Sequence, residues 1–360
     1  REYGEINSEN ATPVPNPASF RKPEPPHLDP EGNFYVYHAM SGDTLPAVAK
    51  RFGVEAGQIT SPETLTGTGW LSPQQVLVIP NVLGEPRHTD ILLPDSEVVY
   101  SPSAQDFNIN EFVQAAGGYL REHEELVNGK WMSGVDIVKK VSMENSINPR
   151  ILLAMLELRS GWVFGAQGGS EKVDYPIGFY VPDYQGLYYE LVLTATHLGV
   201  GYYGWRSGEK VSLSFQDGGW LRMAPGINPG SAALQTVLSK FMTEVEWRST
   251  LFGENRFTDL YAAMFGDSWN RASESEPLLP LELVQPELLL PFAPGERWSF
   301  TGGPHRSWNA GSPRGALDFS PVTGEPACTT SRAWVTASAQ GIITRAIDNV
   351  VAIDLDGDGR

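Results

Sequence analysis

The chain has 360 residues, more than one ordinary hydrophobic core accommodates, so we expect two or three domains. Its formal net charge of −17, from 26 Lys and Arg against 43 Asp and Glu, argues against nucleic acid as a partner. The single cysteine, Cys328, excludes an intrachain disulfide, and no apolar stretch is long enough to be a membrane helix.

Residues 1–31 are predicted to form an extended spacer, because seven prolines fall between positions 13 and 30. Spacers of this kind often separate a tether from a working domain. A signal or anchor, if the protein has one, would lie upstream of residue 1, which is Arg rather than Met.

A compact unit is predicted over residues 32–82. The stretches "FYVYHAM" and "QQVLVIP" have the composition of strands, and the second one ends at Pro80. Between them, "LPAVAKRF" places its apolar residues at helical spacing. Ser41 or Asp43 can cap the start of this helix, and Gly53 follows its end.

The stretch "YVYHAMSGDTLPAVAKRFGV", followed by "LSPQQVLVIPN", resembles a LysM module over nearly the whole of this unit. The resemblance implies a βααβ fold that binds N-acetylglucosamine polymers such as peptidoglycan and chitin. It also implies a glycan groove between the loop after the first strand and the region from Ile59 to Leu65. The implied glycan-binding residues are Ser41, Gly42, Asp43, Thr44 and Ile59. The alternative is that Gly42-Asp43-Thr44 is only a helix-capping turn.

Residues 83–106 are predicted to be a linker, and residues 107–273 a mainly helical domain. The segment "SGVDIVKKVSMENSINPRILLAMLELRSGW" contains two amphipathic helices, and the second begins at Asn148-Pro149. Three later segments are also helical in pattern: "GLYYELVLTATHLGVGYYGWR", "GSAALQTVLSKF" and, as the last helix, "FTDLYAAMFGDSW".

The segment "INPRILLAMLELRSGW" resembles the helix of lysozyme-like lytic transglycosylases that carries the general acid in a Glu-Ser pair. This chain has Arg159-Ser160 there, and a guanidinium is a poor proton donor near neutral pH. Glu157 lies two residues earlier, about 200° round the helix. We therefore interpret Glu157 and Arg159 as ordinary polar positions of a helix.

Residues 274–292 form a connector rich in Pro and Leu, which is too apolar for a free linker, and we expect it to lie flat against a neighbouring domain. Residues 293–360 change to the alternating pattern of strands in "AWVTASAQGIITRAID" and "NVVAIDLD". The predicted fold class is therefore multidomain α+β: a small βααβ module, a helical lysozyme-like middle domain, and an antiparallel β domain that is incomplete at residue 360.

The stretch "GPHRSWNAGSPRGALD" contains the candidate metal ligands His305 and Asp318, 13 residues apart. A hydrolytic zinc site takes three protein ligands from His, Asp and Glu, and leaves a fourth position for water. "ALDFS" predicts the start of a strand carrying Asp318, with His305 in the preceding loop. One His and one Asp at this spacing are a weak signal when taken alone.

The flanks of this stretch, "GGPH", "ALDFS", "GEPA" and "AQGIITRA", resemble the N-terminal part of a LytM/lysostaphin-type zinc metalloendopeptidase of the β-lytic branch. The resemblance implies that His305 and Asp318 bind zinc, at the longer spacing of that branch. The position four residues before Asp318, where most of the superfamily has His, is Arg314.

The family also implies a third ligand and catalytic histidines in a later His-x-His strand, but no histidine follows Asp318 in this sequence. Those groups are expected after Arg360. Three explanations stay open: a longer enzyme, a second chain that completes the C-terminal sheet, and a degenerate site that serves as a scaffold.

A second metal site is suggested by "DLDGDG", because Asp354, Asp356 and Asp358 alternate as at the start of a calcium loop. The distal Glu of such a loop is missing, and a strand followed by an Asp-Gly turn explains the same pattern.

Together these patterns predict an exported cell-wall protein, extracellular or in the cell envelope. It would bind peptidoglycan through its LysM module and hydrolyse peptide cross-links with a zinc-activated water. The alternative is a non-catalytic peptidoglycan-binding or surface-assembly protein with degenerate hydrolase domains. A third option, sugar cleavage through Glu157, would need reducing-end or anhydro-sugar products.

Overall fold

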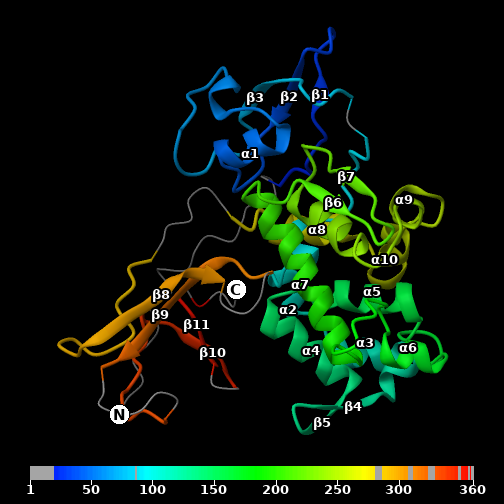
Figure 1. Cartoon of the computed structure of the whole chain (residues 1–360), viewed down its shortest axis with the longest axis vertical. Helices are drawn as coiled ribbons and strands as arrows, with labels where there is room; N and C mark the ends of the chain where they lie inside the picture. The colour runs from blue at the N-terminus through cyan, green and yellow to red at the C-terminus, as the bar shows by residue number, and fades with distance from the viewer. Residues whose placement is uncertain are drawn as a thin grey trace. The chain divides into compact units, whose positions relative to one another are not determined.

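The structure is a computed structural model that describes residues 20–85, 87–279, 286–306, 311–322, 329–347, 350–355 and 357. The chain divides into two compact units. One comprises residues 17–281 with 308–313, and the other comprises residues 1–16, 282–307 and 314–360. The mixture of helices with several small antiparallel sheets confirms a multidomain α+β fold (Figure 1).

The first unit begins with a three-stranded antiparallel sheet. Its strands are β1 (His27–Leu28), β2 (Phe34–His38) and β3 (Val76–Pro80), in the order β1-β2-β3. The two strands predicted from "FYVYHAM" and "QQVLVIP" are thus confirmed. Strand β1 lies inside the stretch predicted as a spacer, of which residues 1–19 lie outside the described residues.

Helix α1 (Leu45–Phe52) packs against this sheet through Val48 and Phe52, which are fully buried. Gly53 ends the helix in a left-handed conformation, as predicted. The predicted caps at its start were wrong, because the residue before the helix is Thr44, and its side chain accepts no capping hydrogen bond. The second helical element is one short 3₁₀ turn, η3 (Ala56–Gln58).

The rest of this unit is a helical domain with one continuous core. Its helices are η4 (Asp95–Glu97), α2 (Pro102–Gln105), α3 (Ile109–Ala116), η5 (Tyr119–Arg121), α4 (Gly134–Asn145), α5 (Pro149–Ser160), α6 (Ser170–Asp174), α7 (Leu187–Arg206), α8 (Pro229–Leu238), α9 (Glu244–Phe252), α10 (Phe257–Phe265) and α11 (Ser268–Ser275). Two short hairpins that periodicity did not predict join them, β4 (Glu124–Val127) with β5 (Lys130–Ser133) and β6 (Ser212–Ser214) with β7 (Trp220–Arg222).

Helix α7 is the centre of this domain, since it packs against both α4 and α8 (Figure 1). Its buried Trp205 donates a hydrogen bond from Nε1 to the carbonyl of Ile227 at 2.9 Å. The predicted start of α5 is confirmed, because Asn148 accepts from the Arg150 amide and Pro149 occupies the first turn. Within the described residues, no helix is long and apolar enough to cross a bilayer.

Two boundaries predicted from the sequence need correction. Residues 83–106 are not a free linker, because Leu93 and Val98 are buried in the helical core. The helix predicted as the last one, α10, is followed by α11, whose start is capped by Asp267.

The second unit contains two separate antiparallel hairpins. Strand β8 (Trp298–Arg306) pairs with β9 (Arg314–Pro321), and β10 (Ile342–Ile347) pairs with β11 (Val350–Asp354). The predicted antiparallel pattern is therefore present, although the described residues 331–341 form no strand.

The Pro/Leu-rich connector is only partly described, because residues 280–285 lie outside the described residues. At its start, Leu278 packs against the core of the helical domain. Beyond the gap, Leu288, Leu289 and Leu290 are exposed. The predicted packing of this segment is thus observed at Leu278.

Candidate functional site

The pair His305 and Asp318 lies on two neighbouring strands, β8 and β9. Nε2 of His305 is 2.7 Å from Oδ2 of Asp318, and about half of each side chain is exposed (44% and 54%). The prediction that His305 lies in a loop was wrong, because β8 runs to Arg306 and includes it. The prediction of a strand at Asp318 is confirmed by β9.

Irregular pairing brings these two side chains together. The register places His305 opposite Ala316 and Gly302 opposite Asp318, with register shifts between them. A Cβ atom at Gly302 would lie 3.1 Å from Oδ2 of Asp318, which is tighter than most real contacts. The missing side chain at position 302 therefore leaves room for the carboxylate to reach the imidazole.

The donor atoms of this pair suit a zinc ion. Imidazole nitrogen and carboxylate oxygen are both common zinc ligands, and a tetrahedral ion bound by both would hold them roughly 3.3 Å apart. The observed 2.7 Å is a direct hydrogen bond, so a small outward movement of two half-exposed side chains would admit the ion. Within the described residues there is no group of three or more His, Cys, Asp or Glu that could hold a metal ion. Among the described residues, the pair thus supplies two of the three protein ligands that a hydrolytic zinc site takes.

The candidate calcium ligands are described only in part, since Asp356 and Asp358 lie outside the described residues. Asp354 is buried at the end of β11, and its Oδ1 accepts a hydrogen bond from the amide of Gly357 at 3.0 Å. This hydrogen bond joins the carboxylate of Asp354 to the backbone three residues later, as in a local turn.

Asp43, one of the five predicted glycan-binding residues, is buried in a polar network. It accepts hydrogen bonds from the Tyr37 hydroxyl at 2.6 Å and the Met40 amide at 2.9 Å, and forms an ion pair with Arg51 at 2.5 Å. Burial, followed by the negative charge of Asp43, raises the pKa of Tyr37 well above its ordinary value of 10.0. Asp43 thus fixes the loop after β2 and is not presented to solvent.

The other four glycan-binding candidates differ in exposure. Ile59 is buried in the core of the small sheet, and Gly42 is buried as well. Ser41 and Thr44 are half-buried. Ser41 donates a hydrogen bond from Oγ to the carbonyl of Leu279, 238 residues further along the chain. The structure therefore does not bring these residues together as one open surface.

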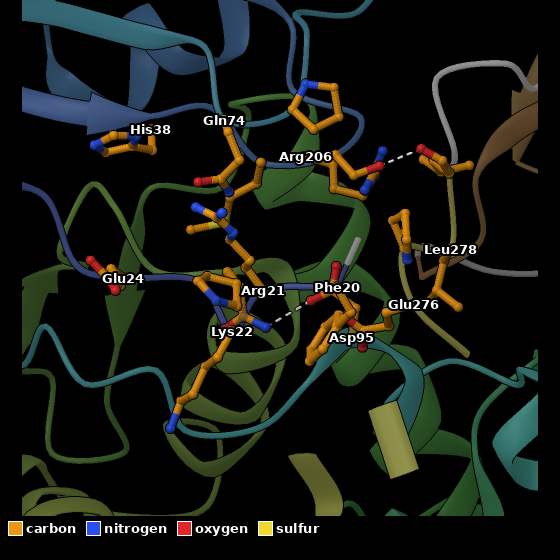
Figure 2. Close-up of a pocket in the computed structure, with 17 residues that line it drawn as sticks. Phe20, Arg21, Lys22, Glu24, His38, Gln74, Asp95, Arg206, Glu276 and Leu278 are labelled. Carbon is orange, nitrogen blue, oxygen red and sulfur yellow. Dashed lines mark hydrogen bonds between the residues drawn. The ribbon is translucent and has the colours of Figure 1, made fainter. Parts of the chain in front are cut away.

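A cavity of about 220 Å³ lies next to this loop. Figure 2 shows that it is bounded by His38 of β2 and Gln74 of the turn before β3, and by Arg206, Asp95 and Glu276 of the helical domain. Ser41 also lines it, together with the chain segment from Phe20 to Glu24.

Two carboxyl groups form the floor of this cavity, the buried Glu276 and the half-buried Asp95. Oδ1 of Asp95 accepts hydrogen bonds from Asn228 Nδ2 and the Gly230 amide, both at 2.8 Å. Oε1 of Glu276 accepts from the Ser96 amide at 2.8 Å. Burial, followed by the charge of Asp95, raises the pKa of Glu276 to about 8, and burial also raises the pKa of Asp95.

These floor residues were not predicted from the sequence. Asp95 was assigned to a linker and Glu276 to a connector, and neither lies in a local sequence pattern that marks a functional site. Only their tertiary contacts, across more than a hundred residues of chain, distinguish them.

The candidate acid Glu157 has a structural role in the helical domain. Its Oε2 accepts hydrogen bonds from the amides of Val163 and Phe164, at 3.0 and 3.1 Å. Arg159 donates from Nε to the carbonyl of Ile177 at 2.8 Å, and its guanidinium lies over the Phe241 ring. These contacts agree with the interpretation of both residues as ordinary polar positions of a helix.

Comparison with known families identifies the helical domain. Residues 91–279, just over half of the chain, match the family described as LasA, N-terminal domain. The chain therefore belongs to this family, the N-terminal region of the LytM/β-lytic peptidases. No curated protein and no solved structure matches the chain.

Proposed function

We propose that this chain is part of a peptidoglycan hydrolase that cleaves peptide cross-links, with His305 and Asp318 as two of its zinc ligands. The observation that carries the proposal is the 2.7 Å approach of these side chains on adjacent strands, in a chain whose helical domain belongs to the LasA N-terminal family. A cell-wall peptidase agrees with that family membership.

In this proposal the protein positions the metal through strand geometry. His305 offers Nε2 and Asp318 offers Oδ2, from backbones held together by the β8–β9 ladder. Zinc, when bound, supplies an acidified water and polarises the scissile carbonyl. Gly302 keeps the space beside the carboxylate open. In the proposed enzyme, the third ligand and the catalytic histidines are groups other than these two residues.

We further propose that residues 32–82 are a LysM-type module that holds the protein on peptidoglycan, in an extracellular or cell-envelope location. The βαηβ order of β2, α1, η3 and β3 supports this proposal, because it follows the βααβ order of that module. The strongly acidic chain also agrees with a carbohydrate or peptide partner rather than a nucleic acid.

Zinc binding tests the first part of the proposal. Competition of the chain with a chromogenic chelator gives the zinc affinity for the natural sequence and for His305→Ala and Asp318→Ala. We expect each substitution to weaken zinc binding at least tenfold. The matched controls are His27→Ala and Asp183→Ala, which alter exposed residues far along the chain from this pair. Equal zinc affinity for His305→Ala and His27→Ala would refute the assignment.

A second candidate function is a peptidoglycan-binding or surface-assembly protein without activity. The observation that favours it is that the described residues contain no third metal ligand beside His305 and Asp318. Binding to purified peptidoglycan, with release of neither amino groups nor reducing ends by the whole protein, would support this alternative.

A further inference from the structure

The loop after β2 is covered by the helical domain. Ser41 donates to the carbonyl of Leu279, and the carbonyl of Gly42 accepts a hydrogen bond from Nη2 of Arg206 at 3.3 Å. A Cβ atom at Gly42 would overlap the Arg206 guanidinium and lie 2.8 Å from Cδ1 of Leu279. Only glycine permits so close an approach, so this contact is tightly packed.

A second set of contacts joins the same helical domain to helix α1. Nη2 of Arg222 donates to the carbonyls of Lys50 and Arg51, at 2.8 and 3.0 Å, near the C-terminal end of that helix. At Gly208, a Cβ atom would lie only 3.0 Å from Cβ of Lys50. Residues 34–80 are thus held at both the loop and the helix.

Arg51 connects these contacts to the shape of the loop. Its guanidinium is fully buried, lies 5.5 Å from the centre of the Trp205 ring in α7, and pairs with Asp43. Asp43 in turn holds the Met40 amide, at the beginning of the covered loop. One buried side chain therefore contacts the helical domain and supports the loop conformation at the same time.

The space left beside the covered loop is small. The cavity of about 220 Å³ is below the roughly 300–1,000 Å³ of sites that enclose drug-sized ligands. The chain segment Arg21–Glu24 forms a further wall of it (Figure 2). Arg206 and Leu279 of the helical domain occupy the space next to Ser41 and Gly42 on this side of the loop.

We propose that the LasA-type helical domain holds the glycan-binding loop of residues 39–44 in a closed state, through Arg206 and Leu279. The inference rests on the proposed binding of peptidoglycan by residues 32–82 and adds its regulation. Opening of this contact exposes Ser41 and Gly42 to a glycan strand. The apparent affinity for the glycan equals the affinity of the open state multiplied by the fraction of molecules that are open, so the closed state lowers it.

The test compares the full chain with the double variant Arg206→Ala/Arg222→Ala, which removes three hydrogen bonds to residues 42–51. Its matched control is Arg248→Ala/Arg256→Ala, since these arginines form surface ion pairs within the helical domain. The single variant Arg206→Gln is a milder change in case the double variant folds poorly. Hydrogen exchange of the peptide covering residues 39–46 measures opening, and co-sedimentation with purified insoluble peptidoglycan measures binding.

We expect faster exchange in residues 39–46 and binding that is tighter on the order of tenfold in the double variant, with no change in the control. Arg206→Gln should change both quantities in the same direction but less. Faster exchange with no binding by any variant would refute the proposed glycan-binding function instead. Faster exchange with weaker or equal binding overturns the closed-state proposal, as does exchange that stays unchanged.

Discussion

Glu276 should make the stability of the helical domain depend on pH. Its carboxyl is buried beside Asp95, and its pKa rises from an ordinary value of 4.5 to about 8. At a pH between these two pKa values, the folded state therefore binds a proton that the unfolded state has lost. Since the unfolded state holds fewer protons there, stability falls as pH rises through this window.

The size of the effect follows from the two pKa values. Between pH 5.5 and pH 7.5, the loss of stability is on the order of 2–3 kcal/mol. Glu276→Gln removes the titration but keeps an oxygen that can accept from the Ser96 amide. We therefore expect the free energy of unfolding of the variant to fall by about 2–3 kcal/mol less than that of the natural chain over that interval.

Urea unfolding at pH 5.5, 6.5 and 7.5, followed by tryptophan fluorescence, measures this difference. The buried Trp205 and Trp247 both report on the helical domain. Glu274→Gln serves as the control, because Glu274 is exposed and only two residues away. Parallel pH profiles for the natural chain and Glu276→Gln would refute the reasoning, since they would show that the carboxyl titrates equally in both states.

Three further substitutions test the packing. Arg51→Met leaves Asp43 buried without its partner and should lower the free energy of unfolding by about 3–5 kcal/mol in denaturant titration. Glu157→Ala leaves two backbone amides without their acceptor and should lower the free energy of unfolding by about 1–3 kcal/mol in the same assay. If the variant instead lost the formation of anhydro-sugar products, Glu157 would have a catalytic role. Gly226→Val would overlap the Pro26 ring and should lower the melting temperature in calorimetry; an unchanged value would argue against that contact.

Local patterns predicted the elements that have clear boundaries. The strands β2 and β3 alternate in burial, and the apolar spacing of α1 matches its buried face, so both were readable from the sequence. The short hairpins β4–β5 and β6–β7 were missed because segments of three or four residues carry too little periodicity. The predicted end of the last helix was wrong because Gly266 ends α10 and the adjacent Asp267 caps the start of α11.

The identity of the two candidate metal ligands could be predicted from the sequence, but their geometry could not. His305 and Asp318 could be proposed from the residues around them, but the position of His305 within β8 depends on register shifts that no spacing reveals. The contact of Ser41 with Leu279 joins residues 238 positions apart, and Asp43 was read as a surface residue although Arg51 buries it. Tertiary packing determines both the Ser41–Leu279 contact and the burial of Asp43, and sequence periodicity does not predict such packing.

The central claim, that His305 and Asp318 are ligands of one zinc ion, is tested most directly by X-ray absorption at the zinc edge. The zinc-loaded chain should show the outer-shell scattering of a bound imidazole, together with nitrogen and oxygen neighbours at about 2.0–2.2 Å. His305→Ala should lose the imidazole signal, and His27→Ala should keep it. An imidazole signal of full amplitude in His305→Ala would contradict the account.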